Sequence, residues 1–164
     1  LKRLFNDLTE QQELLECGPF NQVVPGTAMG FWMPSPSPNN PPLDPSERGF
    51  GEWDTIWLSE SNKDPSVHVL SVGDNTFGLD YGGYHIVTAS AGLVNRRWDA
   101  IKPGHTYCAE FMGSQNEEPA LTITKILIMG LSEDGLELTM EAITGDKCGD
   151  GPWSFQGGER IFYR

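Results

Sequence analysis

Short stretches of strand-like sequence follow one another from Trp53 to the C-terminus, and residues typical of turns separate them. The clearest stretch is 136–143, in which apolar and polar residues alternate and the acidic residues share one face. Asp134-Gly135 precedes it, a dipeptide that tight hairpin turns favour. A half-buried antiparallel strand has this alternation, because one face packs on the core and the other meets water. The pattern favours a sheet built from consecutive hairpins.

The number of such stretches predicts a mainly β protein of eight or nine strands. Short connections between sequential strands favour an antiparallel up-and-down barrel, since closure removes exposed strand edges. A two-sheet β-sandwich is the alternative fold. The predicted strands are 53–60, 67–72, 76–81, 84–91, 93–101, 105–112, 121–129, 136–143 and an interrupted strand over 153–164.

Two different segments precede the predicted barrel. Residues 1–17 carry apolar side chains at helical spacing, and Gly18-Pro19 follows as a stop, so an N-terminal amphipathic helix is predicted. Residues 18–52 form a proline-rich loop segment that is either an ordered flap or a plain linker. The expected organisation is a single domain over 1–164, with the barrel spanning 53–164.

The charge balance narrows the classes of partner. The chain has 11 Lys and Arg against 23 Asp and Glu, a formal net charge of −12. A surface that follows nucleic-acid or lipid phosphates needs clustered basic residues, so no nucleic acid and no membrane are expected as partners. No apolar run reaches the length that spans a bilayer. The acidity indicates a solubilising surface or, alternatively, an acid-rich cation site.

Several familiar kinds of active site have no support in the sequence. It contains no phosphate-binding loop, no dinucleotide-binding fingerprint and no G-x-S-x-G nucleophile motif. Cys17, Cys108 and Cys148 lack the spacing of a zinc site. Cys108 and Cys148 could form a disulfide, or all three could be buried thiols. We therefore expect no metal and no cofactor.

One short motif connects the two ends of the predicted barrel. Gly51-Glu52-Trp53 opens its first strand, and Arg160 and Arg164 lie in its last. This resembles the calycin pattern of lipocalins and their relatives, in which a basic residue of the last strand covers the tryptophan of a G-x-W on the first. The resemblance covers at most residues 51–164 and implies a barrel with a capped indole. In lipocalins the helix follows the barrel, whereas here it is predicted before it.

The leading functional hypothesis is a barrel that binds one small hydrophobic or aromatic molecule, since a barrel of this strand number can hold such a ligand. Large aromatic side chains suit a ligand pocket, although they suit an ordinary core equally well. The predicted lid is the helix or the proline-rich segment. The candidate ligand-binding residues are Trp32, Trp57, Trp98 and Tyr107.

A second hypothesis is a cofactor-free lyase, isomerase or cyclase acting in the barrel. Among the three histidines, His85 is preferred because apolar neighbours suggest partial burial, which shifts a pKa. Arg97 could bind a carboxylate or simply pair with Asp99. Tyr107 and Glu110 complete the set of candidate catalytic residues, with Glu110 a general acid or base if it is buried.

A third hypothesis is a protein-interaction domain, or a surface or capsid domain of a larger protein. The start at Leu1 and the long proline-rich segment motivate it. Such a domain is expected to present exposed aromatic residues in its loops. The sequence carries no signal for oligomeric state or compartment.

Overall fold

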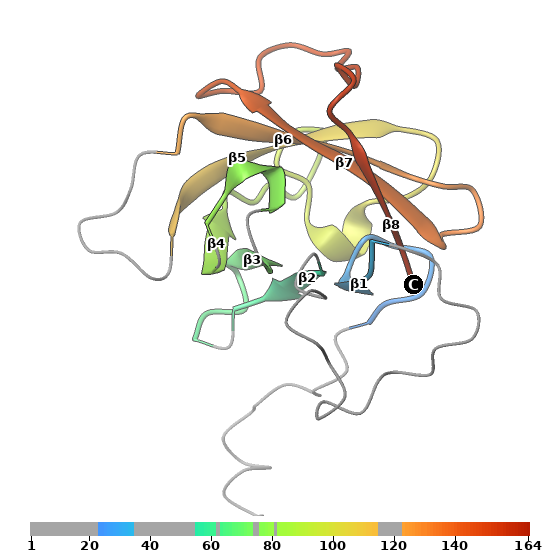
Figure 1. Ribbon diagram of the computed structural model, residues 1–164. Coiled ribbons are helices and arrows are strands. Elements are labelled where there is room, and N and C mark those ends of the chain that lie inside the picture. Colours follow the sequence, from blue (N-terminus) through green and yellow to red (C-terminus); the bar gives the residue numbers. More distant parts are fainter. Residues whose placement is uncertain (1–22, 35–54, 62, 74–75, 81, 115–122) are drawn as a thin grey trace, which may run out of the picture.

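The computed structural model describes residues 23–34, 55–61, 63–73, 76–80, 82–114 and 123–164. In this part of the chain, eight strands form one antiparallel sheet in which each strand pairs with the next along the sequence (Figure 1). The mainly β fold is therefore confirmed. The strands are β1 (Gly30–Trp32), β2 (Ile56–Glu60), β3 (His68–Val72), β4 (Gly82–Ile86), β5 (Thr106–Ser114), β6 (Lys125–Leu131), β7 (Glu137–Thr144) and β8 (Arg160–Tyr163).

The sheet closes on itself where β8 meets β1. The N–H of Met33 donates to the carbonyl of Tyr163 at 2.8 Å, and the N–H of Tyr163 donates back to the carbonyl of Met33 at 2.7 Å. Figure 1 shows β8 descending to the C-terminus beside β1. This single bridge joins the two edges of the series, so the sheet is a nearly closed barrel rather than a two-sheet sandwich.

The barrel begins earlier in the sequence than predicted. β1 lies inside the segment 18–52, which was expected to be loop. Three residues are too few for an alternating pattern to be visible, and the strand is recognisable only by its pairing with β2. The predicted helix 1–17 and the motif Gly51-Glu52-Trp53 lie outside the described residues. The single-domain organisation remains a prediction.

Two predicted strands are wrong, because single aromatic side chains pack inside the barrel from short 3-10 turns. Residues 76–81 contain the turn η1 (Thr76–Gly78), and residues 93–101 contain the turn η2 (Trp98–Ala100) and isolated bridges. Phe77 of η1 packs against the core, and Trp98 of η2 is wholly buried. In the last predicted strand, pairing is confined to β8.

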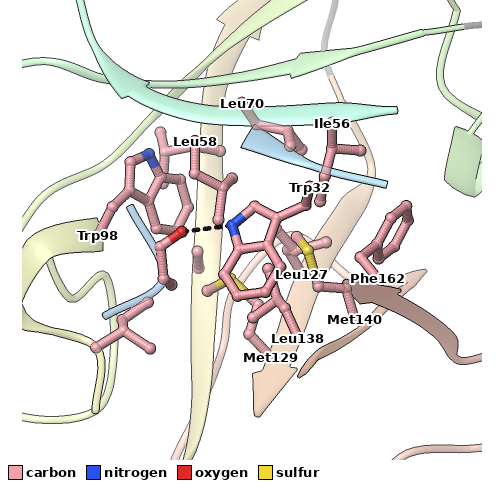
Figure 2. Close-up of a cluster of buried hydrophobic side chains, with 14 of the residues drawn as sticks. Trp32, Ile56, Leu58, Leu70, Trp98, Leu127, Met129, Leu138, Met140 and Phe162 are labelled. Atoms are coloured by element: carbon pink, nitrogen blue, oxygen red, sulfur yellow. Dashed lines mark hydrogen bonds between the residues drawn. The ribbon is translucent and has the colours of Figure 1, made fainter. Parts of the chain in front are cut away.

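The interior of the barrel is built from alternate residues of each strand, as half-buried strands require. Connections on opposite sides define two ends: the Trp98 end, where η2 joins β4 to β5, and the Phe77 end, where η1 joins β3 to β4. Figure 2 shows how the central side chains meet. The largest fully buried ones in this core are Trp32, Trp98, Phe162, Ile56, Leu58, Leu70, Ile86, Ile101, Leu127, Met129 and Leu138.

A second, smaller cluster lies outside the barrel, on β5 and β6. The disulfide between Cys108 and Cys148 fastens the β7–β8 connection there, which confirms one of the two readings of the cysteines. With Ile126 these cysteines form a buried cluster against which Trp153 packs. Because this cover buries the outer side of β6, its apolar run 126–129 does not alternate with polar residues.

An indole lies at the point where the barrel closes. The Trp32 side chain is wholly buried, and its Nε1–H donates to the carbonyl of Ala28 at 2.8 Å (Figure 2). The guanidinium carbon of Arg164 lies 3.8 Å from the centroid of the Trp32 ring. Gly30-Phe31-Trp32 is itself a G-x-W on the first strand. A cation that follows β8 therefore caps an indole of the first described strand, Trp32, while Trp53 lies outside the described residues.

Arg164 also joins the closure to the segment before β1. Its Nη1 donates to the carbonyl of Val24 at 3.4 Å, and its Nη2 donates to the carbonyl of Thr27. Burial lowers the pKa of Arg164. A desolvated guanidinium interacts more strongly with an aromatic face than an exposed one does.

No helix in the described residues is long and apolar enough to cross a membrane.

We expect the variant Arg164→Met to lower the free energy of unfolding by about 2 kcal/mol, because it removes the cation over Trp32 and two carbonyl contacts. Urea denaturation measures the change. The control Lys147→Met removes the same charge from an exposed loop residue and is expected to change stability by less than about 0.5 kcal/mol. Equal effects of the two variants would contradict the role of Arg164.

Candidate functional site

At the Trp98 end of the barrel, buried aromatic side chains form hydrogen bonds with neighbouring elements. The indole Nε1–H of Trp98 donates to the carbonyl of Val69 at 3.2 Å, and its backbone N–H donates to Nδ1 of His68 at 3.0 Å. The hydroxyl of Tyr107 accepts the N–H of Lys102 at 3.1 Å. These contacts use aromatic side chains to seal this end of the structure.

His68 is a buried, neutral histidine, only 1% exposed. Its Nδ1 accepts a hydrogen bond, so the proton of the neutral ring resides on Nε2. Nε2 has no hydrogen-bond partner and lies 4.0 Å from Oε1 of Glu60. Burial, and then the nearby Arg97 charge, lower the pKa of His68 to about 4, against a smaller opposing effect of Asp99.

The predicted catalytic residue Arg97 is held in ion pairs at the same end. Its Nη2 lies 2.7 Å from Oε1 of Glu60, and its Nε lies 3.2 Å from Oδ1 of Asp99. The hydrogen bond to Asp99 is the largest of the causes that raise the pKa of Arg97. The sequence left Arg97 either to bind a ligand carboxylate or to pair with Asp99. In the structure it pairs with Asp99, and Glu60 is its second partner.

The other predicted catalytic residues occupy different places. Tyr107 is buried inside the barrel, whereas Glu110 lies on the outer face of β5. The Glu110 carboxylate accepts the backbone N–H of Cys148 at 3.0 Å and the Nδ2–H of Asn95 at 3.3 Å. His85 is half-buried on the outer face of β4. Arg97, Tyr107 and Glu110 are therefore engaged by three separate sets of partners.

The predicted ligand-binding tryptophans are also spread over the fold. Trp32 and Trp98 belong to the fully buried core. Trp57 lies on the opposite face of β2 from Ile56 and packs against Phe31, with ring centroids 5.6 Å apart. Whether any of these residues contacts a ligand remains a prediction.

The apolar side chains at the Phe77 end are less deeply buried than those at the Trp98 end. Four half-buried apolar side chains pack against the main core, and all four lie towards this end; we call them the Phe77 rim. Three other parts of the chain contribute to it besides η1: β5, the residues just before β6, and β7. The rim consists of Phe77, Phe111, Ile123 and Ala142.

A single lysine lies among these apolar side chains. Lys125 begins β6, and its register with Thr144 places it on the interior side with Leu127. Its Nζ donates to the carbonyl of Phe77 at 2.6 Å and to that of Gly78 at 3.0 Å. None of the ion pairs found in the described residues involves Lys125. The cation is therefore held by two neutral carbonyl oxygens.

Comparison with known proteins found no matching family model, no matching curated protein and no matching solved structure. Among the described residues, no group of three or more His, Cys, Asp and Glu side chains is placed to hold a metal ion.

The sequence prediction missed both Phe77 and Lys125. Phe77 was assigned to a strand, although it belongs to a turn. Lys125 carried a usable signal, because it shares alternation parity with Leu127 and Met129 in the predicted strand 121–129. A charged residue on the apolar face of a strand is a candidate functional residue.

We expect the free energy of unfolding to fall as pH falls from about 6.5 towards 4, by up to about 3 kcal/mol through His68 alone. The sign follows from the lowered pKa: the unfolded chain takes up the proton first, so acid favours unfolding. Urea denaturation at several pH values measures the slope.

His68→Asn keeps an acceptor for the Trp98 N–H but does not titrate, so it should flatten this slope. His85→Asn, on the outer face of β4, is the matched control and should leave the slope steep. A slope in His68→Asn as steep as that of the wild type would contradict the assignment.

Proposed function

We propose that this protein binds one small hydrophobic or aromatic molecule, and that it does so at the Phe77 end of the barrel. The observation that carries the proposal is the unequal burial of the two ends. Aromatic groups fill the Trp98 end, while the half-buried apolar residues of the interior gather in the Phe77 rim. Apolar surface that is left partly open inside a barrel marks the place for an apolar ligand.

The enzyme hypothesis has less support. It requires at least two of His85, Arg97, Tyr107 and Glu110 to reach one substrate. The partners of Arg97 and Glu110 are a glutamate at the Trp98 end and a backbone N–H outside the barrel. Both groups are thus occupied in holding the fold, and Tyr107 faces the core.

The interaction-domain hypothesis also has less support. It expects exposed aromatic residues in the loops. The large hydrophobic residues that are exposed in the described part of the chain are aliphatic or methionine: Val23, Val24, Leu93, Met112, Leu136 and Ile161. The disulfide favours a compartment outside the reducing cytosol, which fits a binding protein of that environment.

The test uses N-phenyl-1-naphthylamine, a neutral apolar probe whose fluorescence rises on leaving water. We expect saturable binding at one site per chain. Ala142→Phe adds a ring to the rim and should weaken binding about tenfold or more. Leu136→Phe adds the same ring at an exposed residue of the Trp98 end and should leave binding unchanged.

Because Ala142→Phe can overpack the interior, near-ultraviolet circular dichroism checks its fold and Ala142→Leu provides a smaller change. A stepwise loss of affinity from alanine to leucine to phenylalanine supports a site at the rim. Absence of probe binding to the wild type, or equal loss in Leu136→Phe, would overturn the proposal.

A further inference from the structure

The turn η1 holds an aromatic ring inside the barrel on an unfavourable backbone. Phe77 has φ 62° and ψ 17°, in the left-handed region that a bulky side chain rarely adopts. Its ring lies 5.7 Å from that of Phe162, which is wholly buried. The ring thus occupies interior space, although the turn that carries it belongs to a surface connection. Packing and hydrogen bonding therefore stabilise a backbone conformation that Phe77 would otherwise avoid.

Lys125 supplies that hydrogen bonding. The carbonyls of Phe77 and Gly78 both accept from its Nζ. Gly78 has φ +61°, and a Cβ there would lie 2.7 Å from Nζ, so only glycine allows this approach without a shift. A carboxylate, sulfonate or phosphate oxygen is a stronger acceptor for an ammonium group than a neutral carbonyl is.

The charge distribution inside the barrel favours an anion at the same place. At the Phe77 end, the described strands place one partly buried charged residue on the interior side, the cationic Lys125; Arg160 has interior parity on β8 but is exposed. The interior-facing acid Glu60 lies at the other end and is paired with Arg97. The chain as a whole carries a net charge of −12. An anionic group therefore finds a locally favourable potential at Lys125, against an otherwise acidic protein.

We propose that η1 occupies the ligand site as an internal substitute, and that the ligand is a small amphiphile with an anionic oxygen group. The Phe77 ring stands where the apolar or aromatic body of the ligand lies, beside Phe162. The carbonyls of Phe77 and Gly78 stand where its anionic group meets Lys125. Binding displaces the turn Thr76–Gly78 and exchanges two neutral acceptors for a charged one. This inference rests on the proposed function and adds the ligand class and the displaced segment.

A matched pair of probes tests it. 1-Anilinonaphthalene-8-sulfonate has the same aromatic body as N-phenyl-1-naphthylamine and adds one sulfonate. We expect the wild type to bind the anionic probe about tenfold more tightly than the neutral one, because only the anionic probe gives Lys125 a charged acceptor in place of the two carbonyls. Titration calorimetry provides the stoichiometry, which should be one probe per chain.

Variants separate the two parts of the proposal. Lys125→Met should abolish the preference for the anionic probe while the neutral probe still binds, and Lys125→Arg should retain the preference. Phe77→Ala removes the competing ring and should strengthen binding of both probes severalfold. The control Lys102→Met removes an exposed lysine at the Trp98 end and should keep the preference.

The outcomes distinguish this inference from the proposed function. Binding of the neutral probe without a preference that depends on Lys125 overturns the anionic ligand class and leaves the proposed function intact. Equal loss of the preference in Lys102→Met overturns it as well. Weaker binding of both probes to Phe77→Ala overturns the displacement of η1. Absence of neutral-probe binding to the wild type overturns the proposed function, and this inference with it.

Discussion

The stacking of Arg164 on Trp32 joins the two ends of the strand series, and the closed barrel depends on it. β1 has only three residues, and two backbone hydrogen bonds connect its end to β8. So few backbone bonds bring little stability by themselves. The buried indole and the desolvated guanidinium add an attraction at the same point, and Arg164 extends it to the carbonyls of Val24 and Thr27. Strand pairing and side-chain stacking therefore act on one junction.

Closure makes the interior a limited space, and the chain fills it unevenly. At the Trp98 end, indole, imidazole and phenol groups form hydrogen bonds with backbone atoms from other elements. At the Phe77 end, one turn contributes a ring in a strained conformation, and one lysine holds that turn. An end built from fully buried aromatic groups favours a single arrangement, whereas a turn held in a strained backbone conformation by one lysine can exchange partners. For this reason the ligand site that we propose lies at the Phe77 end.

Contacts on the outer face of the barrel fasten the β7–β8 connection to the strands. The Cys108–Cys148 disulfide and the carboxylates of Glu110 and Glu141 all bind the β7–β8 connection: Glu110 accepts the N–H of Cys148, and Glu141 accepts those of Gln156 and Gly158. The acids of this face thus have structural partners. These contacts give Glu110 a structural role, one that does not require it to act as a general acid or base.

The sequence by itself determined the class of fold and its best hairpin, because alternation and turn residues are local. The predicted strands 121–129 and 136–143 correspond to β6 and β7, with the Asp134-Gly135 turn between them. Only the tertiary structure decided which tryptophan Arg164 covers, which histidine is buried and neutral, and which carbonyls Lys125 binds. These contacts join residues far apart in the chain, such as Trp32 with Arg164 and Phe77 with Lys125. Phe77 and Trp98 were assigned to strands because an apolar run looks the same whether it pairs in a ladder or sends one ring into a core.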